Sequence, residues 1–209
     1  MSRRNFRAFV WIVAGPLCGL IALAVLAAPM GCDPNDQSEE GLDKSFLRDV
    51  AAMQAMGVPV YWLGTEFTVD GHVFRGPYVS EFGAEVEGGG IQMDYVTAID
   101  GANIGPTLTI YSRPAWELAK DRMTNPTTPG ASRRTVSVLG KDAEMFSTPG
   151  GARPLNATWL VVDLNDVVAV ARANSVIAPA ARGGGELNPF INNPDLLVQV
   201  MQDLRPYPQ

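Results

Sequence analysis

The sequence contains very little cysteine and histidine. Of its 209 residues two are cysteines, Cys18 and Cys32, and one is a histidine, His72. Cys18 lies inside a long apolar run, so the remainder has one thiol and no disulfide framework. A histidine-rich metal site is excluded, and a Ser/His/Asp or Cys/His triad would have to be built around His72. We expect His72, which follows an Asp-Gly pair, to be a surface turn or strand residue.

Basic residues are scarce beyond the N-terminus. Arg3, Arg4 and Arg7 are the only charged residues before Asp33, so the rest of the chain carries 13 Lys and Arg against 22 Asp and Glu, a net charge of -9. A surface of this sign repels phosphate groups, which argues against nucleic-acid binding and polybasic docking on lipid headgroups. At 46% hydrophobic, the chain has enough apolar material for a packed core. Contact with membrane lipid must therefore come from the N-terminus.

Charge is absent from the 23 residues between Ala8 and Met30. As a helix this run would be about 34 Å long, enough to cross a hydrocarbon core of about 30 Å. Arginines precede it and acidic residues follow it, a pattern that keeps the N-terminus inside and sends the rest outside. We assign residues 1–31 as a signal peptide or membrane anchor and expect an extracytoplasmic location at the cell membrane for the remainder.

The first residues of this segment resemble the twin-arginine export motif. Arg3 and Arg4 stand between Ser2 and Asn5 as that motif requires, whereas Arg7 and Ala8 occupy the places where it usually has leucine and a basic residue. Paired arginines are also common in ordinary signal peptides. The ordinary secretory route is therefore the favoured alternative.

The end of the segment resembles the lipobox of bacterial lipoproteins. Gly31 and Cys32 match it, while Pro29 and Met30 stand where leucine and a small residue are usual. The resemblance implies that Cys32 receives diacylglycerol and becomes the new N-terminus. If the lipobox is not processed, the apolar helix stays as a single-pass anchor, and both alternatives leave the domain outside the membrane.

A tether and one domain follow. Residues 32–42 are acidic and contain Pro34 and Gly41, which favours a solvated, flexible spacer. We assign residues 43–206 to one extracytoplasmic domain of ordinary size. The Pro, Gly and Thr-rich stretch 124–132 is the best internal boundary, which gives possible subdomains 43–123 and 133–206.

Hydrophobic periodicity predicts an α+β fold, a mainly antiparallel sheet packed by two or three helices. Helical spacing predicts helices from Asp43 to Gly57, over 116–123 and over 194–204. Period-two alternation predicts strands over 58–63, 67–69, 72–74, 82–86, 91–99 and 108–111.

The C-terminal half has the strongest strand pattern. Residues 135–139 and 142–146 predict a hairpin around Gly140 and Lys141, with glycine at the first position of a type II′ turn. Residues 158–163 and 166–173 predict a second hairpin whose strands are apolar on both faces, so they should be central and covered by the last helix. This pattern resembles a small module at the C-terminal end of uncharacterised bacterial cell-envelope proteins. The resemblance implies a surface-anchored protein of unknown role, and it implies no particular activity.

Candidate binding residues are few. We expect Tyr61, Trp62 and Tyr78 to be exposed aromatics, with Trp62 a possible ligand contact. The loop 178–189 places Arg182 beside three glycines, where it could reach an anionic ligand, although plain flexibility explains the loop as well. No cofactor or metal is indicated.

Three classes of function fit this sequence. A binding or interaction module of the cell envelope, with a protein or peptide partner, is favoured over an enzyme. A carboxylate-based cell-wall hydrolase would need two acidic groups about 5 to 9.5 Å apart. The third class is a sensor domain of an envelope regulator. The acidic candidates for hydrolysis cluster at two predicted hairpins and are Glu81, Glu85, Glu87, Asp94, Asp163 and Asp166.

Overall fold

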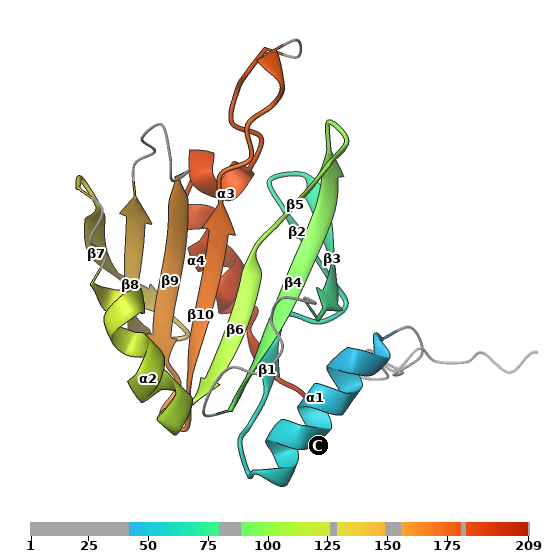
Figure 1. Ribbon diagram of the computed structural model, residues 1–209, viewed down its shortest axis with the longest axis vertical. Coiled ribbons are helices and arrows are strands. Elements are labelled where there is room, and N and C mark those ends of the chain that lie inside the picture. Colours follow the sequence, from blue (N-terminus) through green and yellow to red (C-terminus); the bar gives the residue numbers. More distant parts are fainter. Residues whose placement is uncertain (1–41, 80–88, 126–128, 149–155, 181–182, 209) are drawn as a thin grey trace, which may run out of the picture. The chain divides into compact units, whose positions relative to one another are not determined.

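The computed structural model describes an α+β domain, a mainly antiparallel sheet with a few helices, as predicted (Figure 1). The described residues are 42–79, 89–125, 129–148, 156–180 and 183–208. The predicted export signal with Arg3 and Arg4, the lipid site Cys32, the predicted strand 82–86 and Arg182 all lie outside these ranges. No helix within the described ranges is both long and apolar enough to cross a membrane.

Eight strands form the main sheet, and every neighbouring pair is antiparallel. From one edge to the other, the order is β2 (Glu66–Val69), β3 (His72–Tyr78), β4 (Gly90–Ile99), β6 (Thr107–Ser112), β10 (Val167–Asn174), β9 (Ala157–Asp163), β8 (Lys141–Thr148) and β7 (Ser132–Val138). A ninth strand, β5 (Ala102–Ile104), pairs only with the end of β4. Sequence periodicity missed β5 because only Ile104 of its three residues is a large apolar one, so the segment shows no alternation.

The predicted halves 43–123 and 133–206 share this sheet. β6 pairs with β10 over six residues, from Ser112 opposite Val167 to Thr107 opposite Arg172. Each half supplies four of these eight strands. The last main-sheet strands of the two halves, β6 and β10, pair with each other in the middle of the sheet. The helix α2 (Arg113–Thr124) and the boundary stretch connect the two halves.

Helices cover both faces of the central strands. Leu160 and Val161 are successive residues of β9, so their side chains point to opposite faces. Leu160 belongs to the core cluster that also contains side chains of α1 (Lys44–Ala55), α3 (Pro189–Asn192) and α4 (Asp195–Gln202), whereas Val161 belongs to the cluster that contains side chains of α2. Figure 1 shows α2 and α4 on opposite sides of the sheet. The prediction that the last hairpin is central and covered by the final helix is confirmed.

The C-terminal segment holds the N-terminal helix and strand together. Only Tyr61 and Trp62 of the predicted strand 58–63 form a strand, β1, and its partner is β11 (Arg205–Pro206) instead of the main sheet. The Tyr207 amide donates to the Val60 carbonyl at 2.8 Å. In Figure 1 the C-terminal segment runs beside β1 and α1. This pairing joins residues about 145 apart in the chain, which local periodicity cannot reveal.

The turn of the first C-terminal hairpin differs from the prediction by one residue. Leu139 and Gly140 form the turn, with Val138 paired to Lys141. Both turn residues have positive φ, 51° and 71°, as a type I′ turn requires and a type II′ turn does not. Leucine rarely adopts this conformation, so residue preferences do not predict a turn at Leu139.

Tyr95 joins β4 to the segment that carries β1. Its hydroxyl accepts a hydrogen bond from the Leu63 amide at 3.0 Å, and its side chain is fully buried. Burial raises the pKa of the Tyr95 hydroxyl well above its usual range, and the Leu63 amide and Arg205 lower it by less. The unfolded pKa is about 10. Because the pKa of Tyr95 is higher in the folded than in the unfolded state, its protonated hydroxyl contributes fully to the free energy of unfolding below about pH 10. This contribution is lost as the pH rises through the folded pKa.

We expect Tyr95→Phe to lower the free energy of unfolding at pH 7 by about 1–3 kcal/mol, because the Leu63 amide loses its buried acceptor. The variant should also lose less stability between pH 9 and 11 than the wild type does. Urea unfolding midpoints across this range measure both effects. Tyr78→Phe, at an exposed tyrosine, is the matched control and should change neither. Identical midpoints for Tyr95→Phe and wild type would contradict the assigned hydrogen bond.

Candidate functional site

A β-bulge in β3 places the side chains of Arg75 and Tyr78 on the same face of the sheet. Arg75 pairs with Val96 and Tyr78 with Asp94, so three steps along β3 match two steps along β4. The extra residue brings Arg75 and Tyr78 to one face, where regular alternation would put them on opposite faces. The bulge contains the cis peptide bond between Gly76 and Pro77.

Gly76 allows β3 to approach β4 closely at the bulge. A Cβ atom at this position would lie 2.6 Å from the Asp94 carbonyl oxygen and 2.9 Å from the ring of Tyr95. Both distances are shorter than real Cβ contacts, so only glycine fits. The Gly76 amide also donates to the Thr65 carbonyl at 3.1 Å, which fixes the residue that precedes β2.

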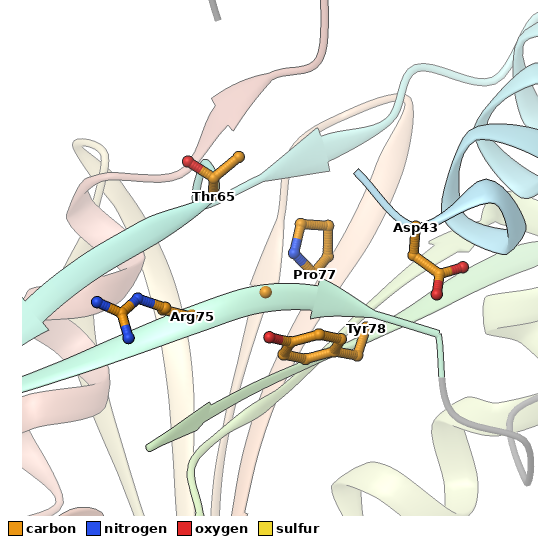
Figure 2. A pocket seen from close by; sticks show the side chains of 6 residues that line it. Asp43, Thr65, Arg75, Pro77 and Tyr78 are labelled. Carbon is orange, nitrogen blue, oxygen red and sulfur yellow. The ribbon is translucent and has the colours of Figure 1, made fainter. Parts of the chain in front are cut away.

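The bulge forms one wall of an open cavity of about 270 Å³ (Figure 2). Its lining comes from the N-cap of α1, the start of β2 and the bulge of β3, and consists of Asp43, Thr65, Arg75, Gly76, Pro77 and Tyr78. In Figure 2, Arg75 and Asp43 lie on opposite sides, with Pro77 and Tyr78 between them. The cavity therefore has a cation at one end, an anion at the other and a pyrrolidine and a phenol ring between.

The two charges of the cavity are held differently. One oxygen of Asp43 accepts from the Ser45 amide at 2.6 Å and caps α1, and this bond is the largest of the effects that lower the pKa of Asp43. The Ser45 hydroxyl, the Phe46 amide and the charge of Arg48 also lower the pKa of Asp43, and its side chain is exposed at the cavity. Within the described part of the chain, the ion pair of Arg75 is a long contact with Glu66, 3.7 Å from Nε, and both side chains are mostly exposed. Such a pair contributes little, so the guanidinium remains available.

The expectation that Trp62 is an exposed aromatic residue and a ligand contact is wrong. Trp62 is 2% exposed, stacks on Phe46 and meets Tyr207 edge to face, so it is a core residue and not an exposed aromatic. The C-terminal segment covers it. Tyr61 is half-buried, and only Tyr78, at 47% exposed, matches the expectation. The indole N–H of Trp62 is buried and has no acceptor among the described residues.

The base of the loop around Arg182 is ordered by backbone and carboxylate contacts. Ile177 forms an antiparallel bridge with Glu186, and the Ala178 amide donates to the Gly185 carbonyl at 2.9 Å. The Glu186 carboxylate accepts from the amides of Val176 and Asn188 at 2.9 and 2.8 Å. Glu186 therefore closes the loop and has a structural role. Arg182 itself lies in the undescribed pair 181–182.

The acidic candidates that the structure describes have structural partners or are exposed at a turn. Asp163 binds Arg113 at 2.9 Å, and Arg113 holds the pKa of Asp163 below its usual range. Asp94 accepts from the Thr107 hydroxyl at 2.6 Å, and Asp166 is exposed at the turn. No group of three or more metal-binding side chains occurs within the described ranges. The predicted candidates Glu81, Glu85 and Glu87 lie outside them.

The sequence reasoning missed the cavity, although a signal for it was present. A Gly-Pro pair inside a strand pattern marks a bulge or an edge, because neither residue suits the interior of a regular strand. Gly76 and Pro77 are such a pair and follow the predicted strand 72–74 after one residue, Arg75. His72 starts β3 after the Asp70-Gly71 turn and is half-buried, close to its predicted place.

Comparison of the chain with protein-family models, with curated proteins and with solved structures finds no match. No likeness therefore brings an activity or a ligand to this site. A proposed function must therefore rest on the side chains that line the cavity and on the positions of these residues in the sequence.

Proposed function

We propose that this chain is an extracytoplasmic binding module, held at the outer face of a membrane by its N-terminus, and that the cavity at the β3 bulge is its binding site. The observation that carries the proposal is the position of Asp43, which lines the cavity and follows Cys32 by eleven residues. Eleven extended residues span at most about 40 Å. An anchor at Cys32 would therefore keep the cavity close to the membrane surface.

The uncharged run before Cys32 supports the anchor in two ways. If Cys32 is acylated, each buried methylene of the attached chains contributes about 0.8 kcal/mol to membrane binding. If it is not, the run is long enough to stay as a spanning helix. The lipoprotein is the form we propose, because the single remaining thiol stands directly at the membrane boundary.

The geometry favours binding over hydrolysis. Among the residues that line the cavity, Asp43 is the only carboxylate, whereas glycoside hydrolysis requires two. Asp163, one of the predicted candidates, is engaged by Arg113. A cation, an anion and an aromatic ring around an open cavity are instead the features of a site that holds a small polar ligand.

Mass spectrometry of the membrane-extracted protein tests the anchor. We expect the wild-type N-terminal peptide to begin at Cys32 and to carry the mass of diacylglycerol, and Cys32→Ser to abolish both the cleavage and the added mass. Cys18→Ser, at the only other cysteine, is the matched control and should leave the modification intact. An unmodified full-length N-terminus in the wild type would rule out acylation.

A further inference from the structure

We infer that the cavity at the β3 bulge binds short zwitterionic peptides, with the terminal ammonium at Asp43 and the terminal carboxylate at Arg75. This inference rests on the proposed binding role and adds the ligand class. It starts from the arrangement of charge, since Asp43 and Arg75 line the same cavity and lie on opposite sides of it (Figure 2). A ligand that carries both charges can satisfy both ends, whereas a ligand with one charge satisfies only one.

The state of each charged group supports the assignment. The N-cap bond from Ser45 keeps Asp43 ionised and fixes its direction. The Arg75 guanidinium is planar and pairs with a carboxylate through two parallel hydrogen bonds. Its contact with Glu66 is long and exposed, so a ligand carboxylate can replace it at little cost.

The walls and the volume of the cavity suit a peptide of about two residues. Pro77 and Tyr78 lie between the charges and offer a ring surface for a flat amide group. A cavity volume of about 270 Å³ leaves room for a ligand as small as glycylglycine. The open side of the cavity leaves room for longer chains.

A carboxylate fits this protein better than a phosphate. The chain has a net charge of -6, and a phosphate with almost two negative charges is repelled more strongly than a carboxylate with one. This difference separates peptides from free phosphoethanolamine, a phosphomonoester that also carries an ammonium group. The inference therefore commits to peptides, and a headgroup is a competing outcome of the experiment.

The experiment is a calorimetric titration of the full chain in mild detergent with glycine, glycylglycine, triglycine and tetraglycine. These probes have the same termini and separate them by increasing lengths. We expect one member of the series to bind best, with a Kd of about 1 mM, a typical affinity for a ligand of this size. Its N-acetylated and C-amidated forms should each bind at least about tenfold more weakly.

Two variants locate the site. Asp43→Asn removes the charge but keeps a good helix cap, and Arg75→Gln removes the cation from an exposed position. Each should weaken binding of the best peptide about tenfold without changing the unfolding midpoint. Lys120→Gln and Glu117→Gln alter an exposed ion pair on α2 and should leave binding unchanged.

Three results would overturn the inference. These are no heat of binding for any glycine peptide at 10 mM, equal binding of the blocked and free peptides, and tighter binding of phosphoethanolamine than of every glycine peptide. None of them affects the anchor, which the mass of the N-terminal peptide tests separately. A failed titration with an acylated Cys32 would therefore remove the ligand class and leave the membrane location in place.

Discussion

Trp62→Ala is expected to lower the free energy of unfolding by about 3–5 kcal/mol, the usual cost of removing a large aromatic side chain from a core. Trp62 is 2% exposed and lies between Phe46 of α1 and Tyr207 of the C-terminal segment. Arg205 also lies over its ring, 5.9 Å from the centroid. The substitution therefore removes the side chain that joins β1, α1 and the C-terminus. Thermal unfolding of the detergent-solubilised chain, followed by circular dichroism, measures the effect.

Trp116→Ala provides the matched control for this prediction. Trp116 is only half-buried on α2, where its ring meets Tyr111 edge to face at 5.8 Å. Its removal leaves a smaller cavity and should cost clearly less than the change at Trp62. If Trp62→Ala left the unfolding midpoint unchanged, Trp62 would be the surface residue that the sequence suggested, and the packing described for it would be wrong.

Gly105→Ala is expected to destabilise the protein by about 3 kcal/mol or more, at the upper end of the cost of overpacking. A Cβ atom at this position would lie 1.7 Å from the carbonyl oxygen of Tyr95, which belongs to the backbone of β4. The next residue, Pro106, accepts a hydrogen bond from the Tyr95 amide at 3.0 Å, so the two segments cannot separate without losing it. The expected fall in the unfolding temperature is about 6–12 °C.

Gly185→Ala is the control for Gly105→Ala, because it makes the same substitution at a position where the added Cβ meets no other atom. Gly185 has no atom within 4 Å of a built Cβ and does not have a positive φ. Alanine there should change stability by less than about 0.5 kcal/mol, or raise it slightly through the unfolded state. Equal unfolding temperatures for the Gly105 and Gly185 variants would show that β4 is not held against Gly105 as described.

Local patterns predicted most of the elements of this domain. The helix capped by Asp43, the strand over 91–99 and the last helix all appear close to their predicted bounds, because each is long and has a clear apolar period. The errors lie where distant residues meet. β1 exists as a two-residue strand because β11 pairs with it, and Trp62 is buried because the C-terminal segment covers it.

The candidate site was harder to predict than the fold. Arg75, Pro77 and Tyr78 come from a bulge, where the local strand register changes, and Asp43 comes from a helix start about 30 residues earlier in the chain. Sequence alone could mark Gly76-Pro77 as an irregularity and Asp43 as a cap. It could not show that they line one cavity, because that depends on how α1 packs against the sheet.

Fractionation of cells that express the full chain tests the central claim most directly, namely that the domain is exported and held at a membrane. The account predicts that the protein sediments with membranes, is released by detergent but not by salt, and is cleaved by protease added outside cells stripped of their outer layers. Both the acylated form and the form with a retained helix give this result. Recovery of the intact, full-length chain from the cytosol, soluble without detergent and protected from external protease, would contradict it.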